Sequence, residues 1–124
     1  MKKKIPLILL TILVLNVVGF FVYKQFFTSK PGANHKIVLT EDGFKPDTIT
    51  IHKGDTITFS TNRGKPYWPA SNIHPTHGIY PEFEPLDAVM PNKTWTFKFD
   101  KVGTWAFHDH LAPYFIGRIT VNPI

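Results

Sequence analysis

The chain begins with a long apolar segment. From Ile5 to Tyr23, nineteen consecutive residues carry no charge and are mostly Leu, Ile, Val and Phe. At about 1.5 Å per residue a helix of this length measures roughly 28 Å, close to the roughly 30 Å hydrocarbon core of a bilayer. Because the segment has no polar face at helical spacing, it predicts a membrane-spanning helix rather than the core helix of a soluble domain.

Beyond the first 35 residues the pattern changes to an alternation of apolar and polar positions. The clearest stretch places Trp95, Phe97 and Phe99 on one face and Thr94, Thr96 and Lys98 on the other. Similar pairs are Ile37 with Leu39, Ile49 with Ile51, Ile57 with Phe59, Trp105 with Phe107, and Ile119 with Val121. A period of two between turn residues predicts short strands. The sequence therefore predicts an all-β Greek-key sandwich of antiparallel strands after one N-terminal transmembrane helix.

One region interrupts the strand pattern. Residues 63–91 contain six prolines: Pro66, Pro69, Pro75, Pro81, Pro85 and Pro91. Proline cannot donate a hydrogen bond to a sheet, so this region is expected to be a long ordered loop without strands. A loop of that length in a small domain usually has a function.

The charge distribution bears on location. Five lysines and no acid lie in residues 1–30, whereas residues 31–124 hold nine basic and nine acidic side chains. The net charge of +5 thus belongs to the N-terminal segment, and nucleic acid is not an expected partner. The lysines at positions 2–4 should stay in the cytoplasm, which places the C-terminal domain outside it. We expect a single-pass anchor over residues 1–27, a linker over 28–35 and a domain over 36–124; the alternative is a cleaved signal peptide and a secreted domain.

Two segments of the domain resemble a known family. The first is Gly43-Phe44-Lys45-Pro46-x-x-Ile49-x-Ile51-x-x-Gly54-Asp55-x-Ile57-x-Phe59, and the second is Val89-Met90-Pro91-x-x-x-Trp95-x-Phe97-x-Phe99 followed by Gly103-Thr104-Trp105. Their order and spacing resemble the cupredoxin family over roughly residues 36–122. The resemblance implies a cupredoxin-like sandwich.

Four of the six histidines form two close pairs, which are His74 with His77 in the long loop and His108 with His110 at a strand end. Side chains alternate along a strand, so His108 and His110 should project together while Asp109 points the other way. Histidine is the commonest transition-metal ligand, and two pairs from two segments can supply a site. An inward Asp109 is costly unless it is hydrogen-bonded or is itself a further ligand.

The same histidine motifs resemble those of multicopper oxidases, which are built of cupredoxin domains. By that resemblance His74 corresponds to a blue-copper imidazole, and His77, His108 and His110 correspond to ligands of the catalytic copper cluster. Asp109 stands where the blue-copper cysteine would be, and the chain has no cysteine at all. The resemblance therefore implies a copper site without a blue centre. Imidazole ligands favour copper, with zinc as the alternative.

The sequence thus predicts a membrane-anchored, extracytoplasmic cupredoxin-like protein that binds copper in copper handling or redox chemistry, beside a membrane oxidase or a copper transporter. One alternative is an oxidoreductase with an open type 2 copper site. Another is a metal-free interaction domain whose histidines only form hydrogen bonds. His35 is expected to be solvated. Glu82 and Glu84 are expected to form a solvated rim, with a hydrogen bond to a histidine as the alternative.

Overall fold

The computed structural model describes residues 7–27 and 32–124, and the chain divides into two compact units, Met1–Lys30 and Pro31–Ile124. The first contains helix α1, Leu7–Phe27. Its segment Ile8–Gln25 is long and apolar enough to cross a membrane, although a signal sequence has the same properties. The lysines at positions 2–4 and residues 28–31 of the expected linker lie outside the described residues.

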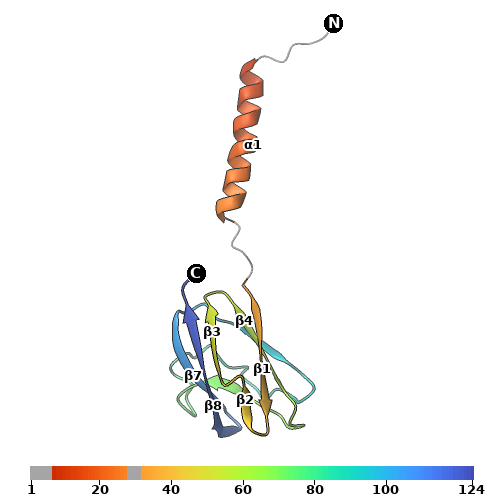
Figure 1. Ribbon diagram of the computed structural model, residues 1–124, viewed down its shortest axis with the longest axis vertical. Coiled ribbons are helices and arrows are strands. Elements are labelled where there is room, and N and C mark those ends of the chain that lie inside the picture. The colour runs from red at the N-terminus through yellow and green to blue at the C-terminus, as the bar shows by residue number, and fades with distance from the viewer. Residues whose placement is uncertain (1–6, 28–31) are drawn as a thin grey trace. The chain divides into compact units, whose positions relative to one another are not determined.

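The second unit is a sandwich of two four-stranded sheets (Figure 1). The first sheet has the order β2-β1-β4-β6, with bounds Gly43–Lys45, Asn34–Thr40, Thr56–Thr61 and Trp95–Lys98. The second has the order β3-β8-β7-β5, with bounds Thr48–His52, Ala112–Asn122, Gly103–Asp109 and Pro69–Ser71. The all-β prediction is confirmed.

Two strand pairs differ from the expected antiparallel arrangement. β1 runs parallel to β4, and β3 runs parallel to β8. After β1 the chain forms the hairpin strand β2, continues into β3 in the other sheet, and returns as β4 on the far side of β1. This crossover through the other sheet allows β1 and β4 to run parallel as hydrogen-bonded neighbours.

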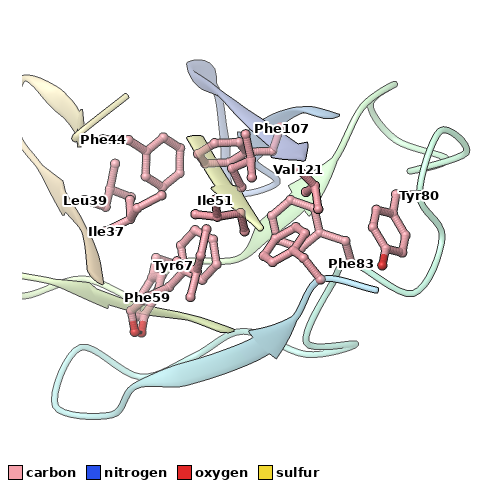
Figure 2. Packing of buried hydrophobic residues seen from close by; sticks show 13 residues of the cluster. Ile37, Leu39, Phe44, Ile51, Phe59, Tyr67, Tyr80, Phe83, Phe107 and Val121 are labelled. Carbon is pink, nitrogen blue, oxygen red and sulfur yellow. The ribbon is translucent and has the colours of Figure 1, made fainter. Parts of the chain in front are cut away.

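The apolar face predicted for each strand lies between the sheets. Figure 2 shows Ile37, Leu39, Phe59 and Phe107 in this core, where each is at most 1% exposed. Aromatic residues of the long loop, Tyr67, Tyr80 and Phe83, are buried in the same cluster. These three aromatic rings bury a large apolar area, and their burial packs the loop against the sandwich.

The long loop contains a strand that the proline content argued against. β5 pairs with β7, with Ala70 opposite His108, and Tyr67 bridges to Val89. The expectation of loop throughout residues 63–91 is therefore wrong at Pro69–Ser71. Proline is tolerated there because β5 is an edge strand and Pro69 is its first residue. This short strand brings the loop beside the end of β7.

The first strand begins at Asn34, two residues before the expected start of the domain. His35 is half-buried, and its Nε2 lies 2.9 Å from Oδ2 of Asp55, so it is not the solvated side chain that the sequence predicted. The backbone N–H groups of Ala33 and His52 also donate to the Asp55 carboxylate. Asp55 thus fixes the start of β1.

Candidate metal centre

The two histidine pairs converge on one point of the domain. His74 and His77 follow β5 in the long loop, His108 lies near the end of β7, and His110 comes just after β7. One ring nitrogen of each lies within 4.8 Å of those of the other three. The pairing of β5 with β7 explains this convergence, because it sets the loop histidines against the end of β7.

Ring nitrogens of the two segments face each other. Nδ1 of His74 lies 3.2 Å from Nε2 of His108, and Nε2 of His77 lies 3.0 Å from Nδ1 of His110. The ring centroid of His77 lies 5.3 Å from that of His108 and 4.8 Å from that of His110. The four imidazoles therefore present their nitrogens to a common centre.

Two of the histidine rings have a hydrogen-bond acceptor at the ring nitrogen that faces away from the centre. Nδ1 of His77 lies 3.1 Å from Oε2 of Glu84, and Nδ1 of His108 lies 2.8 Å from Oδ1 of Asn72. Both partners are acceptors, so they hold the proton on Nδ1 and leave the Nε2 lone pair directed to the centre. A hydrogen-bond acceptor on the outer nitrogen is the usual device that orients a metal-binding histidine.

Burial lowers the pKa of two of the four histidines. His77 and His108 are 4% and 2% exposed, whereas His110 is half-buried and His74 is exposed. Burial, and next the neighbouring His77 and His74, lower the pKa of His108 from 6.5 to about 4. Burial and the same neighbours also lower the pKa of His110. Neutral imidazole is the form that binds a metal.

Trp68 connects the loop to the end of β7. Its ring centroid lies 4.8 Å from that of His110, and its carbonyl oxygen accepts a hydrogen bond from the N–H of His110 at 2.7 Å. Its indole Nε1–H donates to Oε2 of Glu84 at 3.1 Å. Trp68 therefore contacts one histidine directly and meets a second one through Glu84.

Asp109, considered above as a further ligand, lies outside the group of four. Its Oδ1 accepts hydrogen bonds from the N–H groups of Trp68 and Leu111, and its Oδ2 lies 3.7 Å from Nη1 of Arg63. The residue is fully buried. Its contacts are those of a side chain that holds the loop and strand end together.

Asn72 was not predicted from the sequence as a partner of a histidine, and Glu82 and Glu84 were given the same expected role. Glu82 is exposed and pairs with Lys101, whose Nζ lies 2.9 Å from Oε2. Glu84 is half-buried and contacts His77. Both residues flank the buried Phe83, so no local pattern distinguishes them; only the tertiary position of the loop does.

The donor set fits a borderline transition metal. Four neutral imidazoles, two of them oriented by acceptors, suit Cu(II) or Zn(II), whereas Mg²⁺ and Ca²⁺ prefer oxygen ligands. Four protein ligands also fill the coordination of a tetrahedral ion. The arrangement can therefore hold a metal ion without help from another chain.

Comparison with known proteins agrees with this architecture. No protein-family model matches the sequence. The chain is 31% identical over 88 residues to plastocyanin from Vicia faba, covering 64% of this chain and 87% of that protein. A purple cupredoxin from Nitrosopumilus maritimus superposes with a TM-score of 0.62 at 17% identity, covering 71% of this chain and 99% of that one. The reduced Cu(I) form of an amicyanin mutant gives a TM-score of 0.60 at 16% identity, covering 77% and 87%. The two structural likenesses concern the fold.

Proposed function

This chain belongs to the cupredoxin family, and we propose that it is a membrane-anchored, extracytoplasmic member that holds one copper ion through His74, His77, His108 and His110. The observation that carries the proposal is the convergence of four ring nitrogens within 4.8 Å from two segments of the chain. Acceptors behind His77 and His108 strengthen it, because they orient the lone pairs toward the centre. When bound, the ion would supply a redox-active centre that the side chains lack.

Copper is favoured over zinc by the ligand type. Imidazole sites bind Cu(II) more tightly than Zn(II) in the usual order of affinities. A structurally similar protein, the amicyanin mutant, is described as a Cu(I) form. The absence of cysteine from the chain removes the thiolate that a blue centre requires. The proposed site is therefore a weakly coloured copper centre of type 2 character.

The geometry favours copper handling over catalysis. Catalytic metal sites keep a coordination position open, whereas sites with four protein ligands are closed. Here four imidazoles face the centre, and Glu84 and Asn72 immobilise two of them. We therefore propose storage, transfer or electron exchange of copper as the role, beside a membrane oxidase or a copper transporter.

Helix α1 supports a position at the membrane. Its segment Ile8–Gln25 passes the length and hydropathy requirements of a span. We propose that it remains as an anchor with the domain outside the cytoplasm. Membrane fractionation of the expressed chain, with mass determination of its N-terminus, tests this: an anchored chain stays whole in the membrane fraction, and a cleaved one is recovered in soluble form.

The test of the metal centre uses the full chain in detergent, stripped of metal and loaded with Cu(II). We expect one copper per chain and an electron paramagnetic resonance signal split by several nitrogens, with no intense blue thiolate band. His108→Ala with His110→Ala should abolish stoichiometric binding. His52→Ala is the matched control, since His52 is exposed on β3. Stoichiometric copper in the double variant would overturn the ligand assignment.

A further inference from the structure

Glu84 joins the two halves of the histidine cluster. We propose that Glu84 is the positioning residue of the metal centre, which orients His77 directly and His110 through Trp68, and whose negative charge favours the divalent ion over the monovalent one. The proposal rests on the metal site proposed above. It extends that proposal to a residue that is not itself a ligand.

A single oxygen of Glu84, Oε2, contacts both His77 and Trp68. Oε2 of Glu84 lies 3.1 Å from Nδ1 of His77 and 3.1 Å from Nε1 of Trp68. The Trp68 ring in turn packs against His110 with centroids 4.8 Å apart. A single carboxylate thus links a histidine of the loop to the histidine that follows β7. Loss of this link should loosen both rings.

The backbone around Glu84 holds the carboxylate in place. The N–H of Ser71 donates to the carbonyl oxygen of Phe83, and the N–H of Phe83 donates to the carbonyl oxygen of Tyr80. Phe83 is fully buried in the core. The Glu84 side chain is 17% exposed. Glu84 is therefore anchored by the residue before it and shielded from much of the solvent.

Glu84 differs from the other acidic groups near the cluster because no lysine or arginine pairs with it among the ion pairs of the described residues. His108 is oriented by the neutral amide oxygen of Asn72, whereas His77 is oriented by a carboxylate. Asp109 is paired with Arg63, and Lys101 pairs with Glu82 rather than with Glu84. The negative charge of Glu84 therefore lies beside His77 and can interact with an ion held by the four histidines. Four neutral imidazoles leave the full charge on the ion, so a fixed negative charge stabilises Cu(II) more than Cu(I).

The first experiment needs no metal. Nitrogen NMR of the metal-free full chain in detergent reports which ring nitrogen of His77 carries the proton. We expect the Nδ1-protonated form in the wild-type chain and in Glu82→Gln, and also in Glu84→Gln, whose amide oxygen still accepts. Glu84→Leu removes the acceptor and should release this tautomer. A His77 ring with the same Nδ1 proton in Glu84→Leu would overturn the positioning role.

The second experiment measures how the negative charge of Glu84 affects the affinities for Cu(II) and Cu(I). Competition with chelators gives the affinities for Cu(II) and Cu(I) of the wild-type chain, Glu84→Gln and the matched control Glu82→Gln. Removal of a partner behind a ligand typically costs 10–100-fold in metal affinity. We expect Glu84→Gln to lose at least about tenfold more affinity for Cu(II) than for Cu(I), which raises the reduction potential by about 59 mV. Equal losses for both ions, or behaviour like Glu82→Gln, would overturn the role of the charge.

The two experiments separate this inference from the proposed function. A wild-type chain that binds no copper defeats the metal site, and with it the charge step. A wild-type chain that binds copper through its histidines, with the same affinities in Glu84→Gln and Glu82→Gln, leaves the metal site standing and defeats only the role of the Glu84 charge; the positioning role is tested by Glu84→Leu. Since Gln matches Glu in size, this variant keeps the packing of the loop.

Discussion

Asp109 and Arg63 form a buried pair of opposite charges, with Oδ2 of Asp109 3.7 Å from Nη1 of Arg63. Within the described residues, Oδ2 of Asp109 and Nε of Arg63 are buried without a hydrogen-bond partner. The Arg63 guanidinium also lies 4.8 Å from the centroid of the Phe115 ring. Asp109 is therefore held by a cation and by backbone N–H groups.

The pair predicts a strong coupling in stability. Arg63→Met leaves the Asp109 carboxylate buried without a counter-charge and should cost about 3–5 kcal/mol. Asp109→Asn should cost less, because Glu41 lies 3.5 Å from Nε of Arg63 and partly compensates it. The double variant removes both charges, keeps an acceptor for the Trp68 N–H, and should be more stable than Arg63→Met alone. Urea unfolding of the metal-free chain measures the cycle; additive effects would contradict the coupling.

The carboxylate of Asp55 predicts a dependence of stability on acid. Hydrogen bonds from the His52 N–H and from His35 lower the pKa of Asp55 from 3.8 to about 2. A lowered pKa means that the stabilisation is complete above about pH 4 and is lost as the pH falls from about 4 to about 2. Asp55→Asn should therefore cost about 1–2 kcal/mol at pH 7 and almost nothing near pH 2.

Urea unfolding at a series of pH values tests this prediction. Asp42→Asn serves as the control, since Asp42 lies exposed in the turn between β1 and β2. We expect the curves of the control and the wild-type chain to run in parallel. A constant difference between Asp55→Asn and wild type across this range of pH would contradict the assigned cause.

Gly117 lies where the surrounding atoms leave no room for a side chain, not even a methyl group. A Cβ at this position would lie 2.8 Å from the carbonyl oxygen of Asp47 and closer still to Cζ of Phe107. Phe107 is fully buried, so it cannot move aside without opening the core. Gly117→Ala should cost about 1–3 kcal/mol through overpacking. Gly78→Ala is the control, because its nearest neighbour is 3.8 Å away; equal melting temperatures of the two variants would contradict the prediction.

The alternation of apolar residues predicted the fold because it reports burial directly. Ile37, Leu39, Ile57 and Phe59 occupy the core as their spacing requires. The parallel pairs were not predictable, since the period of two is the same for both strand directions. β5 was missed because proline argues against a strand only in the interior of a sheet, and the edge position of β5 is a property of the whole topology.

The residue type and spacing of the four histidines predicted the metal centre, whereas the residues that orient their rings were not predicted. Asn72 and Glu84 orient two rings from behind. Each lies on the loop between β5 and β6, where no periodic pattern assigns a direction to a side chain. Their role depends on how the loop folds over β7. The same holds for the half-buried His35, whose partner Asp55 lies twenty residues further along the chain.

Trp68 predicts an optical signal for copper binding. Its ring contacts the His110 ring with centroids 4.8 Å apart, whereas Trp95 packs on Phe59 and Trp105 packs on Tyr80. Cu(II) quenches indole emission at short range, while closed-shell Zn(II) does not. We therefore expect one equivalent of Cu(II) to quench the emission of Trp68 in the full chain, and Zn(II) to leave it nearly unchanged.

Trp68→Phe separates this signal from the other two tryptophans. The variant keeps a ring beside His110 but loses the indole N–H that donates to Glu84, so it should still bind copper with a loss of no more than about 100-fold. Its emission, from Trp95 and Trp105, should respond weakly to saturating Cu(II). His52→Ala should show the wild-type response. Strong quenching in Trp68→Phe would place the copper nearer to another tryptophan and would contradict a centre built on His110.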